Sequence, residues 1–223
     1  MQRAFRRWTL WIARRRLRGL DRVDIHGLEH LEEALSRGPV VAAPNHVCWW
    51  DALVVLHLCE RLGVDFRVMV DQPSLDRFAF LRAAGAIGVD RSSPMATRHG
   101  LAKARSLLEH PSTLLWVFPQ GRYRPSHQRP LELEGGAAYL AGRSGASLVP
   151  VGLCYPFLQE AQPAAFVTVG PAVSPNVEAL EAGLVQAIDA GEARAEADRY
   201  ALVAAPDLAS RMLGWLFGGV GDA

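Results

Sequence analysis

The sequence predicts an α/β fold: a single αβα domain with a mostly parallel central sheet, preceded by an N-terminal amphipathic helix. Three observations indicate this class. The chain has 223 residues, half of them hydrophobic, which is enough for one sizeable core. Short apolar runs typical of buried strands recur along it. Helical patterns separate most of these runs, as expected when helices connect parallel strands.

The expected strands and helices alternate over most of the chain. Strands are expected at residues 40–43, 66–70, 86–89, 113–118, 147–153 and 166–169, after a short strand and turn at 24–30. Helices are expected at residues 31–36, 52–62, 75–84, 95–108 and 135–144, with one or two surface helices over 177–203. Asp207 is expected to begin a final short helix. Only residues 156–163 separate the last two strands, so that end of the sheet is expected to depart from simple alternation.

Positive charge is concentrated at the N-terminus. Residues 1–22 contain eight arginines and one aspartate, whereas the remainder contains 16 basic and 22 acidic residues. At helical spacing, the apolar and aromatic side chains of this segment share one face and most of its arginines lie on the other. The apolar face comprises Met1, Ala4, Phe5, Trp8, Trp11 and Ile12.

This pattern is typical of a helix that lies in a membrane interface and is attracted by anionic lipids. Residues 1–22 are therefore expected to bind an anionic membrane surface, with residues 23–223 forming the folded domain. A terminal helix packed on the core is the alternative. A nucleic-acid arm is disfavoured, because the aromatic face would have no purpose, so no nucleic-acid partner is expected. No apolar run approaches the roughly 20 residues of a membrane span.

The cysteines favour a reducing compartment. Cys48, Cys59 and Cys154 are odd in number and widely spaced, so neither a disulfide framework nor a structural metal site is expected. Cys48 lies near His46 in the sequence, but tryptophans flank it. We therefore interpret Cys48 as a packing or substrate-lining thiol and not as a nucleophile.

The heptapeptide Asn45-His46-Val47-Cys48-Trp49-Trp50-Asp51 carries the main chemical signal. It follows a strand-like run and precedes a helical pattern, which places His46 at the carboxyl edge of the sheet, where α/β sheets bind ligands. Asp51 would lie in the first turn of the helix, and its carboxylate on Nδ1 would leave Nε2 of His46 free to accept a proton. On these residues alone, a structural His–Asp pair is an equal alternative.

Three further blocks follow along the chain. Gly85 to Arg91 is an apolar strand that ends in Asp90-Arg91, and an arginine there suits a phosphate; a surface turn is the alternative. Residues 118–124, Phe-Pro-Gln-Gly-Arg-Tyr-Arg, form a cationic turn whose glycine allows close backbone approach; an ordinary solvated loop is the alternative. Val149-Pro150-Val151 places a proline in a strand, which predicts an edge strand or an irregular wall.

In this order and spacing, the four blocks resemble the glycerolipid acyltransferases typified by 1-acylglycerol-3-phosphate O-acyltransferase. The family's signatures are Asn-His-x4-Asp, a Gly-x-x-Phe-x-x-Arg-like block, Phe-Pro-Glu-Gly-Thr-Arg and a Val-Pro-Val strand. The resemblance covers roughly residues 25–175, the motif-bearing core, and identifies residues 23–223 as the acyltransferase domain.

The resemblance implies transfer of an acyl chain from acyl-CoA or acyl carrier protein to a lipid hydroxyl. The acceptor would be a lysophospholipid such as lysophosphatidic acid, and the enzyme would be peripheral at the cytoplasmic face of the cell membrane. His46 would be the general base and Asp51 its orienting partner, with backbone N–H groups near Gly121 as candidate oxyanion donors. No metal or redox cofactor is implied. The residues expected to bind substrate are Asn45, Arg91, Gln120, Gly121, Arg122 and Arg124.

The third block departs from the family pattern. Gln120 and Tyr123 stand where the family has Glu and Arg, while Arg122 and Arg124 flank the latter position. This puts lysophosphatidic acid in doubt as the acceptor and leaves a glycolipid or an amino-acid lipid open. An acyl-thioester hydrolase, in which His46 activates water, is a second hypothesis. A non-catalytic relative that lost activity with Gln120 is a third.

Overall fold

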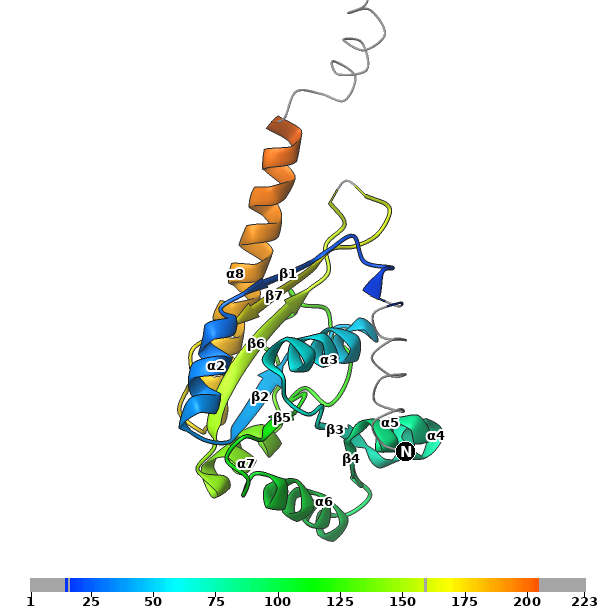
Figure 1. Ribbon diagram of the computed structural model, residues 1–223, viewed down its shortest axis with the longest axis vertical. Coiled ribbons are helices and arrows are strands. Elements are labelled where there is room, and N and C mark those ends of the chain that lie inside the picture. Colours follow the sequence, from blue (N-terminus) through cyan, green and yellow to red (C-terminus); the bar gives the residue numbers. More distant parts are fainter. Residues whose placement is uncertain (1–14, 16, 159, 205–223) are drawn as a thin grey trace, which may run out of the picture.

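The computed structural model describes residues 15, 17–158 and 160–204 (Figure 1). In this part of the chain, seven strands form one sheet in the order β1-β7-β6-β2-β5-β3-β4. The strands are β1 (Val23–His26), β2 (Val40–Pro44), β3 (Val68–Asp71), β4 (Ala86–Val89), β5 (Leu114–Trp116), β6 (Ser147–Cys154) and β7 (Ala165–Val169). The helices are α2 (Leu28–Arg37), α3 (Trp50–Leu62), α4 (Gln72–Arg77), α5 (Ala79–Ala84), α6 (Pro94–Leu107), α7 (Gly136–Ser144) and α8 (Val177–Ala204).

The sheet is mostly parallel, which confirms the predicted fold class. Strands β6, β2, β5, β3 and β4 run parallel to their neighbours in this series. Strand β7 is antiparallel to β6, and β1 is parallel to β7. The departure from alternation that was expected near the last two strands is therefore the antiparallel β6–β7 pair, which a short connection allows.

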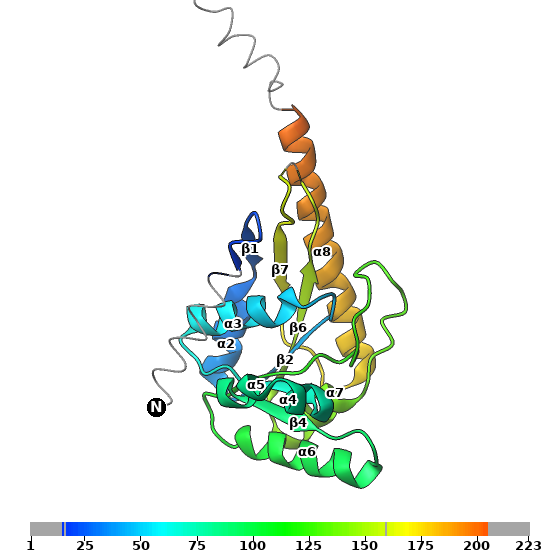
Figure 2. The same ribbon diagram turned by 90° about the vertical axis from the view of Figure 1, so that its right-hand side faces the viewer.

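Helices cover both faces of the sheet, as Figures 1 and 2 show. All five residues of the central strand β2 are buried, as expected for a parallel strand covered on both sides. Val40 and Ala42 face the core formed with α2 and α3, whereas Val41 and Ala43 face the core formed with α6, α7 and the start of α8. This alternation divides the interior into two hydrophobic layers.

The expected helix at residues 75–84 is wrong in detail, because the structure contains two short helices there. Helix α4 begins earlier than expected, since the Asp71 side chain accepts a hydrogen bond from the Ser74 N–H at 3.1 Å and a proline lies in its first turn. The backbone leaves helical geometry at Phe78 (φ −120°, ψ 71°), which separates α4 from α5. Residues 177–204 form the single helix α8.

Pro150 corrects the expectation of an edge strand, because β6 is an interior strand between β2 and β7. Successive residues of a strand direct their N–H and C=O groups to opposite neighbours. Val151 accepts from Asn45 on the β2 side, whereas Pro150 accepts from the Gly170 N–H on the β7 side. The β6–β7 ladder begins only at the next residue, where Val151 pairs with Val169. Pro150 thus lies just before the β6–β7 ladder begins, so its missing N–H removes no hydrogen bond from within that ladder.

Helix α8 packs directly on the sheet through a glycine. A Cβ atom on Gly152 of β6 would lie 2.4 Å from the carbonyl carbon of Ala187 in α8, so only glycine permits this approach. Figure 1 shows α8 running along β6 and β7 and extending beyond the sheet.

The predicted interfacial helix of residues 1–22 lies largely outside the described residues, as does the expected short helix after Asp207. Leu17 and Leu20, at the end of that N-terminal segment, pack against the core beside α2 and α3. Membrane binding by the N-terminal segment stays a prediction, which concerns mainly residues that the structure does not describe. Among the helices that the structure describes, none is both long and apolar enough to cross a membrane.

Candidate active site

The residues of the candidate site lie at one edge of the sheet, where the parallel strands have their carboxyl ends. His46 follows β2, Gln120 follows β5, and Arg91 follows β4. Asp71 ends β3, and Tyr155 follows β6. Loops at this edge of an α/β sheet are where ligands bind, so the topology alone assembles a candidate site from five strands.

His46 and Asp51 form the pair expected from their spacing. Nδ1 of His46 lies 2.7 Å from Oδ2 of Asp51. The same oxygen accepts the N–H groups of Val47 at 2.7 Å and Cys48 at 3.0 Å, so the loop wraps around the carboxylate and fixes it. The Asp51 side chain is fully buried, whereas that of His46 remains 23% exposed. Because a carboxylate can only accept, Nδ1 carries the proton and Nε2 has its lone pair available for a substrate.

Two aromatic rings flank the His46 imidazole. Phe118 and Tyr123 each lie with their ring centroid 4.3 Å from that of His46. Burial, followed by the nearby Asp51 charge, raises the pKa of the Tyr123 phenol above its ordinary value of 10. Tyr123 therefore contributes a neutral aromatic wall beside the imidazole.

Asn45 connects the His46 loop to the neighbouring strand. Its Nδ2 donates to the carbonyl of Leu153 at 2.9 Å, and its Oδ1 accepts the N–H of Leu153 at 2.7 Å. Asn45 is buried, and it is not among the residues that line the cavity described below. The structure thus places Asn45 as a support of the site.

Gln120 is also a supporting residue in this structure. Its side chain is buried, with Oε1 accepting the His46 N–H at 2.7 Å and Nε2 donating to the Leu131 carbonyl at 3.2 Å. The amide has one acceptor and one donor end, and both are matched. A glutamate in this geometry would direct an oxygen at the Leu131 carbonyl, which explains why the amide suits this chain.

Gly121 allows the two charged residues Arg91 and Glu134 to meet above the turn. Its φ is +61°, and a Cβ atom there would lie 2.7 Å from both Arg91 Nη1 and Glu134 Oε1. Arg91 and Glu134 form an ion pair, each about half exposed. The Gly121 N–H donates to the Phe118 carbonyl at 3.1 Å, so this group, expected as an oxyanion donor, is engaged in the turn.

Arg122 and Arg124 point toward a different partner. Both guanidinium groups pair with Glu132, and the Arg124 side chain is only 6% exposed. The charge-assisted contacts with Arg124 and then Arg122 lower the pKa of the Glu132 carboxyl. Neither arginine lines the cavity, so the structure does not bring them together with His46, Arg91 and Gly121.

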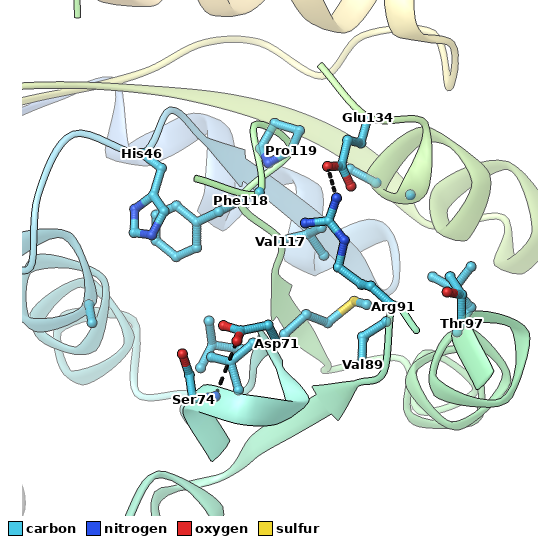
Figure 3. A pocket seen from close by; sticks show the side chains of 18 of the residues that line it. His46, Asp71, Ser74, Val89, Arg91, Thr97, Val117, Phe118, Pro119 and Glu134 are labelled. Atoms are coloured by element: carbon cyan, nitrogen blue, oxygen red, sulfur yellow. Dashed lines mark hydrogen bonds and ion pairs between the residues drawn. The ribbon is translucent and has the colours of Figure 1, made fainter. Parts of the chain in front are cut away.

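One cavity of about 550 Å³ joins these elements, and Figure 3 shows part of its lining. His46 and Phe118 border one end, and Arg91 reaches across to Glu134 at another. Much of the remaining wall is apolar: Phe66, Val68, Val70, Phe78, Leu81 and Val117. Size and lining both suit a ligand with an apolar chain and a small polar group. The described residues contain no group of three or more histidine, cysteine, aspartate or glutamate side chains that would hold a metal ion.

Two further groups, Cys48 and Tyr155, lie near Asp51. Burial, with the Asp51 charge adding to it, raises the pKa of the Cys48 thiol to about 11, which agrees with an unreactive thiol. The same causes raise the pKa of Tyr155 well above 10. Sequence reasoning missed Tyr155, although a strand at 147–153 parallel to one at 40–43 would carry it beside the His46 loop.

A His–Asp pair with a buried carboxylate lies at the carboxyl edge of an αβα sheet, beside an apolar cavity, an arrangement suited to general-base chemistry on a hydroxyl. The model of the Acyltransferase family matches residues 22–154, more than half of the chain. The chain belongs to this family, the glycerolipid acyltransferases. It is therefore an acyltransferase domain for a lipid-type acceptor. A comparison with curated proteins gave no match.

Proposed function

We propose that this protein is an O-acyltransferase that moves a fatty acyl chain from acyl-CoA or acyl carrier protein to a hydroxyl of a lysophospholipid or related lipid. His46 is the general base and Asp51 its orienting partner. The observation that carries the proposal is the 2.7 Å contact between His46 Nδ1 and Asp51 Oδ2, on a histidine that also lines the 550 Å³ cavity.

In the proposed reaction, Nε2 of His46 removes the proton from the acceptor hydroxyl as its oxygen attacks the thioester carbonyl. The new C–O bond gives a tetrahedral oxyanion. When this intermediate collapses, the C–S bond breaks, and the departing thiolate takes the proton from the imidazolium of His46. Asp51 holds the ring in one tautomer throughout and offsets the positive charge that the ring carries between the two proton transfers.

The apolar wall of the cavity supports a fatty acyl chain as the transferred group, since the chain would replace water against Phe66, Val68 and Leu81. The basic, aromatic N-terminal segment supports a peripheral position at the cytoplasmic face of the cell membrane, where lipid acceptors are present. Cys48, Cys59 and Cys154 form no disulfide bonds with one another, which is consistent with a reducing compartment.

The test is acyl transfer from palmitoyl-CoA and from palmitoyl carrier protein, with product detection by mass spectrometry. The acceptors are lysophosphatidic acid, other lysophospholipids, a glycolipid and an amino-acid lipid with a free hydroxyl. His46→Ala and Asp51→Asn are each expected to lower the transfer rate by about 10²–10⁴-fold, because the first removes the base and the second loses its orientation.

Matched controls separate this effect from misfolding. His99→Ala alters an exposed histidine on α6 and is expected to leave transfer unchanged. Circular dichroism should show that all variants are folded. Full transfer by a folded His46→Ala protein would refute the mechanism. Thiol release that is independent of the acceptor would instead identify a thioester hydrolase in which His46 activates water.

A further inference from the structure

The Arg91–Glu134 ion pair is the feature of the cavity that the general reaction does not explain. Arg91 follows β4 and Glu134 lies just before α7, 43 residues apart in the sequence. Both line the cavity, and Figure 3 shows the guanidinium directed at the carboxylate. The Glu134 N–H donates to the Pro119 carbonyl at 2.7 Å, which ties the backbone of Glu134 to the turn after β5. The backbone of Glu134 is therefore held against the same turn that supports His46, which places its side chain beside Arg91.

The cavity is not a cationic site for an anion. Among the described residues, Arg91 is the only arginine or lysine in its lining, whereas Asp71 and Glu134 both contribute carboxylates. The two arginines of the third block, Arg122 and Arg124, pair with Glu132 and do not line the cavity. Apart from His46, the lining therefore carries one positive and two negative side chains.

A purely anionic head group fits this lining poorly. A phosphate monoester on Arg91 would displace Glu134 from the guanidinium and lie beside its unpaired carboxylate, and opposed like charges are a strong discriminating element. A purely cationic group would meet the reverse problem at Arg91. A head group with both charges suits this site. Arg91 exchanges Glu134 for the negative group of the ligand, and Glu134 exchanges Arg91 for the positive group.

The pair can open for such a ligand. Arg91 and Glu134 are 50% and 49% exposed, so their mutual attraction is screened and weak. Gly121 has no side chain beside the Arg91 guanidinium or the Glu134 carboxylate, so these two groups have room to move apart. The bidentate geometry of a guanidinium suits a phosphate or a carboxylate, while Glu134 accepts from an ammonium.

We infer that Arg91 and Glu134 together form the acceptor's head-group site, and that the acceptor is a hydroxyl-bearing lipid with a zwitterionic head group. Arg91 binds its anionic group and Glu134 its ammonium. This inference rests on the proposed transferase function and specifies its acceptor. Two sources supply the required chemistry: a lysophospholipid with an ethanolamine head group, and an amino-acid lipid with a free amine and a carboxylate.

The experiment compares kcat/KM of the full-length protein for four acceptors with one acyl donor. The zwitterionic acceptors are lysophosphatidylethanolamine and the amino-acid lipid; lysophosphatidic acid and a monoacylglycerol are the anionic and neutral comparisons. The kcat/KM of the wild-type protein is expected to be about tenfold or more higher for a zwitterionic acceptor than for lysophosphatidic acid. One buried or half-buried charge contact is enough for a preference of this size. Which zwitterionic acceptor is preferred identifies the source.

The variant Glu134→Gln keeps the shape of the side chain and removes its charge. It is expected to raise KM for the zwitterionic acceptor about tenfold, with little change in kcat, and not to weaken use of lysophosphatidic acid. Glu196→Gln is the matched control, because Glu196 pairs with Arg199 at a similar exposure, 50% and 47%, on α8 away from the cavity. This control is expected to leave all four acceptors unchanged.

Preference of the wild-type protein for lysophosphatidic acid, or an equal loss with every acceptor in Glu134→Gln, would overturn the inference. If transfer depends on His46 but Glu134→Gln does not alter acceptor preference, only the head-group assignment fails. If no acceptor is acylated, or if transfer persists in His46→Ala, the proposed function itself fails and the head-group assignment fails with it.

Discussion

Gln120 holds His46 by the main chain and not by the ring: its Oε1 accepts the His46 N–H at 2.7 Å, while its Nε2 donates to the carbonyl of Leu131. The Arg124 N–H donates to the His46 carbonyl at 2.7 Å from the same loop. Both backbone groups of His46 are thus bound by the segment after β5. The third sequence block therefore fixes the position of the His46 loop, in addition to forming a wall of the cavity.

Replacing Gln120 with the family's glutamate is expected to destabilise this protein. The Gln120→Glu carboxylate would lose the hydrogen bond to Leu131 and would place two acceptors in contact in a buried site. The free energy of unfolding should fall by about 1–3 kcal/mol, the cost of a buried unsatisfied polar group. Urea unfolding measures this, with Gln128→Glu on the exposed surface as the control. If the Gln120→Glu variant is as stable as the wild-type protein or more stable, and if it gains activity, then glutamine at position 120 is instead a substitution that inactivated the site.

Gly121→Ala is expected to affect stability and substrate binding together. A residue with a side chain at φ +61° costs about 1–2 kcal/mol in the left-handed region. The added methyl group would also press on Arg91 and Glu134, which should raise the acceptor KM.

Gly145→Ala separates these two effects. Gly145 has a φ of +68°, but no atom lies within 4 Å of the position that a Cβ would take, so its substitution introduces the same backbone cost without the contact. It should lower the free energy of unfolding to a similar extent and leave KM unchanged. Equal KM values in both variants would show that Gly121 acts only through its backbone conformation.

Cys48 is expected to be dispensable for acyl transfer. Because burial and the Asp51 charge raise its pKa to about 11, its thiolate is a minor species at pH 8. Alkylation of Cys48, followed by peptide mass spectrometry, should be slow at pH 8 and accelerate as the pH approaches 11. Cys48→Ala should retain transfer activity. An acyl-Cys48 intermediate, trapped by rapid quenching, would contradict this and would assign a covalent mechanism.

Deleting residues 1–14 is expected to release the protein from anionic liposomes without unfolding it. The cut retains Leu17 and Leu20, which pack on the core, while it removes the aromatic face and much of the basic charge. Co-sedimentation with liposomes that contain phosphatidylglycerol, at low and high salt, measures the change. Binding of the truncated protein equal to that of the full chain would place the membrane contact elsewhere.

Much of the fold was predictable because its signals are local. A strand buried on both faces is a continuous apolar run, and β2 and β4 appeared within one residue of their expected bounds. The division at Phe78 was not predictable, because the helical pattern continues through it and only the local backbone at Phe78 separates α4 from α5. The interior place of β6 depended on strand order, which a proline in the sequence does not reveal.

The candidate site was likewise predictable only where its sequence signals are local. The His46–Asp51 contact follows from residues five positions apart, and helix geometry suffices to predict it. Glu134 and Tyr155 reach the site only through the topology of the sheet, so no local pattern marked them. Arg122 and Arg124 were expected to bind substrate because they are cationic and near the motif, yet the chain supplies its own partner for both in Glu132.

The carboxamide of Asn45 pairs with both backbone groups of Leu153, just as a further strand residue would. The main chain can therefore turn away to form the histidine loop while the ladder between β2 and β6 continues through a side chain. One consequence concerns hydrogen exchange. The Leu153 amide should exchange with solvent as slowly as those inside the sheet, although its acceptor belongs to a loop residue. The base of the His46 loop would then open only when the centre of the sheet opens.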